Sequence, residues 1–508
     1  MKNRAFATAC RAMRMGAAAW LVTAATGVHA QDLSAGQKIA TQGTASGVPA
    51  CIACHGEAGQ GNADIGMPRL AGTGIGYLQE QLAAFADGKR PSDTMEPFAK
   101  LLTEAERSAL AQYFSSLPPP QGARTSDPAD PAPSDTGAWL ATRGRWADGV
   151  PACASCHGPG GAGVGAAFPP LAGQPAAYIE QQLQNWKAGK RPPGVYGVMP
   201  QAVASKLSDA DIHAVALYYA QATDTPAATG AQPVQPAAAA AKPNAASGAF
   251  EPPPESAMPT GEFGKMVKLG EQIFLHTDQY ASQYTGNVLK CTNCHLDAGR
   301  RAESSPAWAA FVTYPRYRGK EKHVLALAER LQGCFRYSMN GKAPPLGDPV
   351  LIALESYAFW LATGAPVGDM THSGYQRLKP PPQKADYARG EQVYQQQCAL
   401  CHGASGQGQG SQGHTVFPPL WGSRSFNWGA GMTGIDVAAA FIKANMPLGM
   451  GGSLTDQQAW DVATFIDSQD RPQDPRFEGS VEQTRAKYSN SPYSMYGQTV
   501  NGRQLGRP

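Results

Sequence analysis

Capping residues followed by apolar runs predict a closing helix in several similar segments of the chain. A threonine or serine is followed three residues later by an acid or an amide, which is the pattern of a capping box. The boxes and the aromatic residues they lead to are Thr103-x-x-Glu106 before Tyr113-Phe114, Ser208-x-x-Asp211 before Tyr218-Tyr219, and Thr455-x-x-Gln458 before Phe465-Ile466. A further helix begins at Asp348-Pro349 and carries Tyr357 and Trp360. We interpret these aromatic side chains as core residues.

A second predicted helix recurs in the first two segments. It starts at Tyr77 or Tyr178 and stops at Gly88 or Gly189, and each glycine is followed by Lys-Arg. The predicted elements are all helices, so the fold class is expected to be all-α, with repeated small domains.

Two stretches divide these repeats. Residues 119–135 are rich in proline and aspartate, and residues 223–259 are rich in alanine, proline and glutamine. Such compositions cannot build a core, so we expect two pairs of domains joined by a flexible or semi-extended tether. The predicted boundaries are 1–30 for a leader, 31–118 and 136–222 for domains one and two, 260–372 and 373–471 for domains three and four, and 472–508 for an irregular tail.

The first thirty residues have the pattern of a secretory signal peptide. Basic residues precede an apolar stretch from Gly16 to about Val22, and Val28-His29-Ala30 ends the segment. No later apolar run is long enough to span a membrane. The formal charge of +3 includes four basic leader residues, and without them 38 basic side chains face 39 acidic ones. This balance argues against nucleic acid as a partner.

Four Cys-x-x-Cys-His segments indicate covalently attached haem c. Two thiols on one turn add to the vinyl groups of a haem, and the following histidine becomes the first axial ligand of its iron. A zinc site or a redox dithiol is the disfavoured alternative. The segments are Cys51/Cys54/His55, Cys153/Cys156/His157, Cys291/Cys294/His295 and Cys398/Cys401/His402. Because haem c is attached outside the cytoplasm, motifs and leader together predict a periplasmic protein with four haems and all-α class I-like cytochrome c domains.

Methionines recur at a similar distance after three of the histidines and are the expected second axial ligands. Met95 lies 40 residues after His55, Met199 lies 42 after His157, and Met446 lies 44 after His402. Met67 and Met450 are weaker alternatives.

The third segment breaks this pattern. Cys334 lies 39 residues after His295, and Met339 lies 44 after it. Spacing leaves three possibilities open: a thiolate ligand, a methionine ligand, or an inert buried thiol. Of ten cysteines, Cys334 alone is neither a haem anchor nor part of the leader, and coordination to iron would explain how a single exported thiol survives.

The surroundings of Cys334 are basic. Between residues 291 and 342 the formal charge is +5. Most of these residues fit an exposed face or partners of haem propionates, but a subset facing a thiolate-ligated haem would bind a small oxyanion.

The segments Cys291–Arg300 and Glu329–Pro345 closely resemble the dihaem thiosulfate dehydrogenases, a resemblance that covers roughly residues 260–470. The amino-terminal half resembles the c-four type of dihaem cytochrome, which serves such enzymes as electron acceptor. The chain is thus similar to a fusion of the two. The resemblance implies that two thiosulfates are joined into tetrathionate at a haem ligated by Cys334. It also implies substrate binding by Arg330, and by Arg318 and Lys342.

Some members of that family carry lysine beside the distal methionine, whereas this chain has Asn445 there, which favours Met446. The expected electron route leads from haem three through haem four to haems one and two, and then to a soluble cytochrome or an oxidase chain. The alternatives are a tetrathionate reductase, a relative of the cysteine-ligated cytochromes that load thiosulfate onto carrier proteins, and a non-catalytic electron carrier in which Met339 ligates haem three. A dihaem peroxidase is disfavoured because every haem has a candidate sixth ligand.

Overall fold

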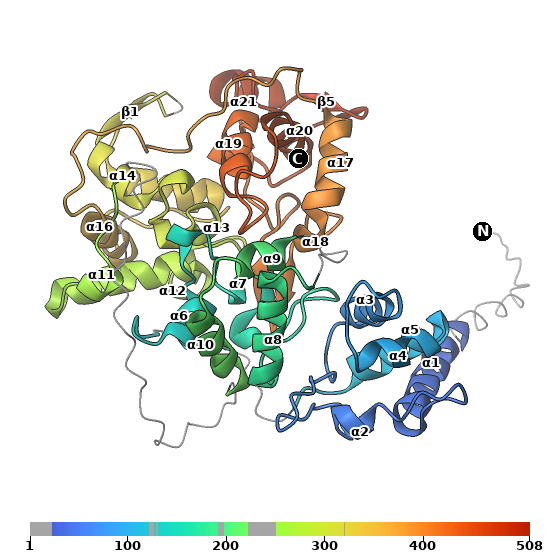
Figure 1. The fold of residues 1–508 in the computed structure, drawn as a ribbon. Helices are drawn as coiled ribbons and strands as arrows, with labels where there is room; N and C mark the ends of the chain where they lie inside the picture. Colours follow the sequence, from blue (N-terminus) through green and yellow to red (C-terminus); the bar gives the residue numbers. More distant parts are fainter. Residues whose placement is uncertain are drawn as a thin grey trace, which may run out of the picture.

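The computed structural model describes residues 23–120, 126–128, 131–191, 198–221, 250–319 and 321–507, and Figure 1 shows their arrangement. Most ordered elements are helices, which confirms the helical class. Three short antiparallel hairpins accompany them and were not predicted. The first 22 residues of the predicted leader, and residues 223–249 of the predicted tether, lie outside the described residues. Among the described helices, none combines the length and hydropathy needed to cross a bilayer.

The amino-terminal half contains ten α-helices within its described residues. In chain order they are α1 Thr23–Gln42, α2 Ile52–His55, α3 Ile75–Ala86, α4 Met95–Leu101, α5 Glu104–Ser116, α6 Thr136–Thr142, α7 Ala154–His157, α8 Ala176–Lys187, α9 Met199–Ala204 and α10 Asp209–Ala220.

The carboxyl-terminal half adds the remaining helices and the three hairpins β1/β2, β3/β4 and β5/β6. Its elements are α11 Gly261–Leu275, α12 Thr277–Tyr280, α13 Cys291–Cys294, α14 Ala307–Thr313, β1 Arg316–Arg318, β2 His323–Leu325, α15 Leu327–Gly333, a π-helical turn Cys334–Ser338, α16 Pro349–Leu361, α17 Tyr387–Gln397, α18 Ala399–His402, β3 Gln409–Ser411, β4 His414–Phe417, α19 Ile435–Asn445, α20 Asp456–Asp467, α21 Val481–Tyr488, β5 Thr499–Val500 and β6 Arg503–Gln504.

The local signals in the sequence produce the expected helix ends. All three predicted capping boxes form, at the starts of α5, α10 and α20. Asp348 caps α16 by accepting a hydrogen bond from the Val350 amide. Gly88 and Gly189 follow α3 and α8 with φ of +68° and +67°, a conformation that favours glycine and ends a helix.

A glycine lies at the crossing of an early and a late helix in four successive parts of the chain. A Cβ atom on each glycine would lie 2.0–2.5 Å from a backbone oxygen of the late helix. The contacts are Gly36 on α1 with Ala109 of α5, Gly137 on α6 with Ala214 of α10, Gly270 on α11 with Ala353 of α16, and Gly390 on α17 with Asp461 of α20. We call these parts units 1 to 4, each running from its early helix to its late helix.

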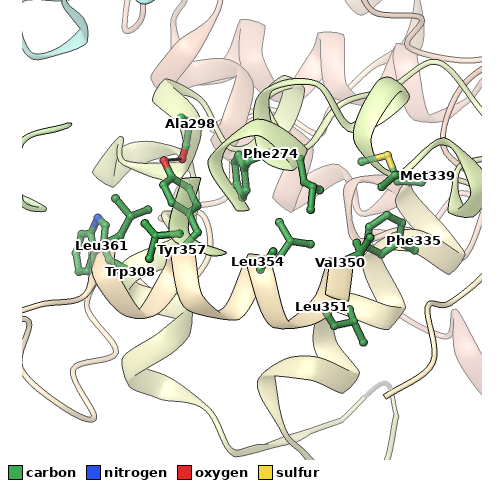
Figure 2. Close-up of a cluster of buried hydrophobic side chains, with 14 of the residues drawn as sticks. Phe274, Ala298, Trp308, Phe335, Met339, Val350, Leu351, Leu354, Tyr357 and Leu361 are labelled. Atoms are coloured by element: carbon green, nitrogen blue, oxygen red, sulfur yellow. Dashed lines mark hydrogen bonds between the residues drawn. The ribbon is translucent and has the colours of Figure 1, made fainter. Parts of the chain in front are cut away.

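Unit 3 has the largest apolar core, and Figure 2 shows part of it. Val350, Leu354 and Tyr357 of α16 pack with Phe274 of α11. The Tyr357 hydroxyl donates to the carbonyl of Ala298 at 2.9 Å, so this buried polar group is satisfied. The prediction that Tyr357 is a core residue is therefore confirmed.

The prediction of an irregular tail was wrong. Residues 472–507 contain α21 and the β5/β6 hairpin, and they form a small core in which Val481, Tyr496 and Leu505 pack with Trp428. The apolar residues that form this core are widely spaced in the sequence, so no short periodic pattern predicted it.

Unit 2 lies between unit 1 and the carboxyl-terminal half, as Figure 1 shows in teal and green. The end of the predicted tether is also packed: Phe250 stacks edge-on against Trp308, with ring centroids 5.0 Å apart, and Arg300 donates to the carbonyls of Pro252 and Pro253. Residues 250–259 therefore belong structurally to unit 3.

The helix crossings predict the effect of a single methyl group. A Gly390→Ala variant would place a Cβ 2.0 Å from the Asp461 carbonyl oxygen, so α17 and α20 must separate. We expect a loss of about 1–3 kcal/mol in stability, measured as a lower midpoint of thermal unfolding of the haem-loaded protein.

Gly431→Ala is the control, because nothing lies within 4 Å of that position and its φ is not positive. Equal midpoints for the two variants would contradict the role of the crossing.

Candidate functional site

Each Cys-x-x-Cys-His segment forms a one-turn helix whose histidine is held by a backbone carbonyl. The carbonyl oxygen accepts from Nδ1, so the proton lies there and Nε2 keeps a lone pair for a metal. Burial lowers the pKa of all four imidazoles, which keeps them neutral. The pairs are His55 with Pro68 at 2.9 Å, His157 with Pro169 at 2.8 Å, His295 with Ser305 at 2.6 Å, and His402 with Pro418 at 2.8 Å.

A cavity of about 690 Å³ joins units 2, 3 and 4. Its lining includes Cys156, Cys294, Cys398, Cys401 and His402. These thiols form no disulfide. Paired thiols on one turn, an adjacent imidazole with a free Nε2, and an apolar cavity beside them fit the attachment of haem c.

Cys54 differs from the other predicted haem anchors, because its side chain is exposed whereas the other seven are half-buried. The structure therefore does not enclose the Cys54 thiol. The equivalent thiol of unit 2, Cys156, is covered because it adjoins Cys401 of unit 4. Unit 1 lies at the edge of the molecule and contacts unit 2 through other residues, so Cys54 faces solvent (Figure 1). A thioether bond does not require a buried sulfur, so the anchoring role of Cys54 stays a prediction from its spacing in the motif.

Two of the three methionines predicted as second ligands occupy corresponding places. Met95 and Met199 are the first residues of α4 and α9, and Met446 directly follows α19. Met199 and Met446 also line the cavity. Met67 instead lies in a β-bridge with Asn62, and Met450 lies in the turn that follows Pro447.

Asn445, beside Met446, links three units. Its Oδ1 accepts from Arg301 Nε at 2.9 Å, and its Nδ2 donates to the carbonyls of Glu303 and Phe441. Arg301 also donates to the Trp146 carbonyl in unit 2 at 3.4 Å. The amide is 3% exposed and has a structural role at this junction.

Cys334 and Met339 lie in different surroundings. Met339 is 5% exposed and belongs to the apolar core of unit 3 beside Phe335, as Figure 2 shows. Cys334 is half-buried at the junction of α15 and the π-helical turn. Its charge acts on a predicted haem-anchoring thiol: burial first, and then Cys334, raise the pKa of Cys294 to about 12. Cys334 therefore lies close to α13, the turn that contains Cys291 and Cys294.

Two of the three predicted substrate-binding cations gather near this thiol. The negative charge of Cys334 is the largest cause of the raised pKa of Arg330, which lies one turn earlier on α15. The pKa of Arg318 on β1 is lowered by burial and also by the charge of Arg330, so the two guanidinium groups share one site. Lys342 is exposed and takes no part in these interactions of the described residues, so its role stays a prediction.

The sequence analysis missed Tyr375. Its hydroxyl donates to the Cys294 carbonyl at 2.9 Å, and its electrostatic neighbours are Cys294, Arg330 and Cys334. Tyr375 lies on the connection between units 3 and 4, outside any repeat, so no sequence signal could have placed it there.

The Cys334 segment is supported from outside unit 3. Asn427 of unit 4 donates to the Arg336 carbonyl at 3.0 Å and to Asn340 Oδ1 at 2.9 Å. Arg476 of the tail lies 4.7 Å from the centroid of the Tyr337 ring and is bonded to Asp474. The π-helical turn is thus held on two sides.

Unit 2 docks on the carboxyl-terminal half through a buried charge and an apolar contact. Arg143 Nη2 lies 3.6 Å from Glu271 Oε2, which also pairs with Lys268 at 2.7 Å. Phe168 and Phe417 pack with ring centroids 4.9 Å apart. The predicted haem-anchoring thiols of units 2 and 4 also adjoin: burial and then the charge of Cys401 raise the pKa of Cys156 to about 12.

The contact between units 1 and 2 is nearly symmetric. Arg90 donates to Tyr178 and Gln182, and Arg191 donates to the equivalent Tyr77 and Gln81. The predicted helices with their Lys-Arg ends therefore supply the interface between the first two units.

Comparisons with known proteins agree with this architecture. The sequence profile of the family described as cytochrome c oxidase, cbb3-type, subunit III matches residues 32–114, 141–218 and 385–466. The thiosulfate dehydrogenase of Thiomonas intermedia (strain K12) is 60% identical over 258 residues, which are 51% of this chain and 82% of that protein. The thiosulfate dehydrogenase electron acceptor of the same organism is 48% identical over 176 residues, 34% of this chain and 77% of that protein.

One solved structure is similar over almost the whole chain. It is the as-isolated form of thiosulfate dehydrogenase (TsdBA) from Marichromatium purpuratum, with a TM-score of 0.82 and 46% identity. The alignment covers 94% of this chain and 99% of that one.

The support of the Cys334 segment generates a prediction. In an Asn427→Ala variant the partly buried carbonyl of Arg336 and Oδ1 of Asn340 both lose the Asn427 side chain as donor. We therefore expect a loss of about 1–3 kcal/mol for the two bonds, measured by thermal unfolding of the haem-loaded protein. Asn490→Ala at an exposed position is the control. An unfolding midpoint equal to that of the control would show that these hydrogen bonds do not stabilise the segment.

Proposed function

The chain belongs to the thiosulfate dehydrogenase family, and from this premise we propose that Cys334 is the residue at which it joins two thiosulfate ions into tetrathionate. The enzyme oxidises thiosulfate, and its electrons pass to the cytochrome half fused to it. The resemblances on which the sequence analysis relied, to the dehydrogenase and to its acceptor, are confirmed.

Units 1 to 4 are proposed as four class I-like cytochrome c domains, each holding one haem c. The anchors are the paired cysteines of the four motifs, the exposed Cys54 included, and the first axial ligands are His55, His157, His295 and His402. The second ligands in units 1, 2 and 4 are Met95, Met199 and Met446. In unit 3 the second ligand is Cys334, supported by its position beside α13 and by the burial of Met339 in the core.

The observation that carries the proposal is the grouping of Cys334 with two guanidinium groups. Arg330 lies close enough to feel the charge of Cys334, and Arg318 feels the charge of Arg330. Guanidinium groups present paired N–H donors that match the oxygens of a sulfonate. A thiolate beside such donors places a nucleophilic sulfur where a bound thiosulfate presents its terminal sulfur.

Haem c, when bound, exchanges one electron at a time at its iron, so units 3 and 4 together accommodate the two electrons of the reaction. Arg330 and Arg318 bind the sulfonate oxygens of the first thiosulfate. The Cys334 thiolate then forms a sulfur–sulfur bond with the terminal sulfur of thiosulfate, and the pair loses two electrons. The product on the protein is a cysteine S-thiosulfonate with one negative charge.

A second thiosulfate completes the cycle. Its terminal sulfur attacks the sulfur attached to Cys334, the bond to the cysteine breaks, and tetrathionate leaves with two negative charges while the Cys334 thiolate is restored. This step is a thiol–disulfide exchange and needs no further oxidant. The same residues serve tetrathionate reduction in the opposite direction.

Electrons cross between the halves at the contact of units 4 and 2, where Cys401 adjoins Cys156 and Phe417 packs on Phe168. We infer the order unit 3, unit 4, unit 2, unit 1, and then a soluble cytochrome or an oxidase chain. The leader pattern and the site of haem c attachment support a periplasmic location.

The proposal for Cys334 is tested by anaerobic mixing. Oxidised, haem-loaded protein is mixed with thiosulfate, haem reduction is followed by absorbance and tetrathionate is assayed. In Cys334→Gly we expect both to fall on the order of 10³-fold or more, because the reacting sulfur is lost. The thiolate signature in the electron paramagnetic resonance spectrum disappears as well.

Met339→Leu is the matched control and should keep the activity within a few fold, with the thiolate signature unchanged. Loss of that signature in Met339→Leu, or its survival in Cys334→Gly, would overturn the assignment. Thiosulfate turnover that persists in Cys334→Gly would show that the reaction does not need this cysteine.

The docking of unit 2 generates a separate prediction. Glu271 is 1% exposed and faces Arg143, whose side chain is 13% exposed, so Glu271→Gln removes the carboxylate charge opposite this guanidinium group. Removing one partner of such a buried pair costs about 3–5 kcal/mol. We expect thiosulfate to reduce units 3 and 4 at the normal rate in stopped-flow absorbance, while reduction of units 1 and 2 slows about tenfold or more.

Glu262→Gln on the same helix is the control, because Glu262 is 90% exposed in its pair with Lys265. Equal rates of reduction of units 1 and 2 in both variants would show that the buried pair does not set the docking.

A further inference from the structure

A second buried charge cluster lies away from Cys334, at the end of α20. The side chains of Asp467 and Arg471 are both 0% exposed, and Arg471 Nη2 lies 3.2 Å from Asp467 Oδ1. The guanidinium group lies 4.4 Å from the centroid of the Phe426 ring and 5.1 Å from that of Trp428. The mechanism above does not use this pair.

The cluster has more hydrogen-bonding capacity than the described residues satisfy. The buried polar atoms without a partner among them are Trp428 Nε1, Asp467 Oδ2, Ser468 Oγ, Arg471 Nε and Arg471 Nη1. Each buried group left unpaired costs about 1–3 kcal/mol. Four of these atoms are donors, so the cluster is built for an acceptor with more than one oxygen.

The cluster adjoins the site proposed for the haem of unit 4. Asp467 and Phe426 line the cavity that His402 and Met446 also line. A haem carries two propionate groups, whose oxygens accept hydrogen bonds. The matching donors are the indole of Trp428, the guanidinium group of Arg471 and the hydroxyl group of Ser468. Asp467 Oδ2 would face the propionate as a second carboxylate oxygen.

Resting on the haem site proposed for unit 4, we propose that Trp428, Ser468 and Arg471 bind a propionate of that haem and that Asp467 takes up a proton from solvent when the haem is reduced. Reduction of the haem adds a negative charge beside Asp467 and the propionate, which share the guanidinium group of Arg471. The proton compensates for this added charge. Asp467 is thus a positioning and proton-coupling residue, not a catalytic one.

The electrostatics of the cluster support proton uptake near neutral pH. Burial raises the pKa of Asp467 to about 7, Asp436 on α19 adds to the rise, and Arg471 opposes it. The other charged neighbours are themselves paired: Asp436 with Arg377, and Asp470, which faces Arg471, with Arg503. Reduction adds negative charge and raises the proton affinity of Asp467 further, so the midpoint potential falls as pH rises through this range.

The test is a spectroelectrochemical titration of the full haem-loaded chain on both sides of about pH 7. The haem of unit 4 is identified through Met446→His, which lowers its potential selectively. We expect its potential to fall with rising pH in the wild type and to be independent of pH in Asp467→Asn. The control Asp470→Asn, whose carboxylate is 51% exposed, keeps the wild-type slope.

Trp428→Phe removes one donor from the propionate, so its negative charge is less compensated and the potential is lower at every pH. A slope that persists in Asp467→Asn, or a wild-type potential without a slope, would overturn the proton-coupling role. An unchanged potential in Trp428→Phe would overturn the propionate site. Thiosulfate-dependent reduction measured alongside separates these failures from a failure of the proposed function.

Discussion

Close backbone contact at the four glycine crossings is the constraint on which the rest of the structure depends. At Gly36, Gly137, Gly270 and Gly390 the early and late helices approach so closely that a Cβ atom has no room. The crossing fixes the angle and distance of the two helices. In every unit the Cys-x-x-Cys-His turn follows the early helix in the sequence. The Cys-x-x-Cys-His turn and the two crossing helices are therefore positioned together in each unit.

The chemistry of unit 3 depends on parts of the chain beyond that unit. Cys334 lies in a π-helical turn, and such turns are uncommon and need support. Asn427 holds the carbonyl groups of the turn, and Arg476 packs on Tyr337 next to it. The role proposed for Cys334 benefits from a backbone held on two sides, because the sulfur then moves by side-chain rotation alone.

Docking of unit 2 gives the two fused halves of the chain a defined arrangement. The tether alone would raise the effective concentration of one half for the other. The buried pair of Arg143 with Glu271 and the contact of Phe168 with Phe417 add a defined arrangement. Unit 1 then attaches to unit 2 by the nearly symmetric arginine, tyrosine and glutamine contacts, so contacts connect all four units along the proposed electron route.

The sequence by itself determined the features that act over a few residues: the Cys-x-x-Cys-His turns, the capping boxes of α5, α10 and α20, and the glycines that end α3 and α8. These depend on hydrogen bonds and covalent bonds between near neighbours, which spacing reveals. Family resemblance added Cys334 and Arg330. Only the tertiary structure brought Tyr375 beside Cys334, left Cys54 exposed while covering Cys156, ordered the tail around Trp428, placed Arg143 against Glu271 and enclosed Asp467 with Arg471. These contacts join residues far apart in the sequence, and their energy comes from burial, which no local pattern records.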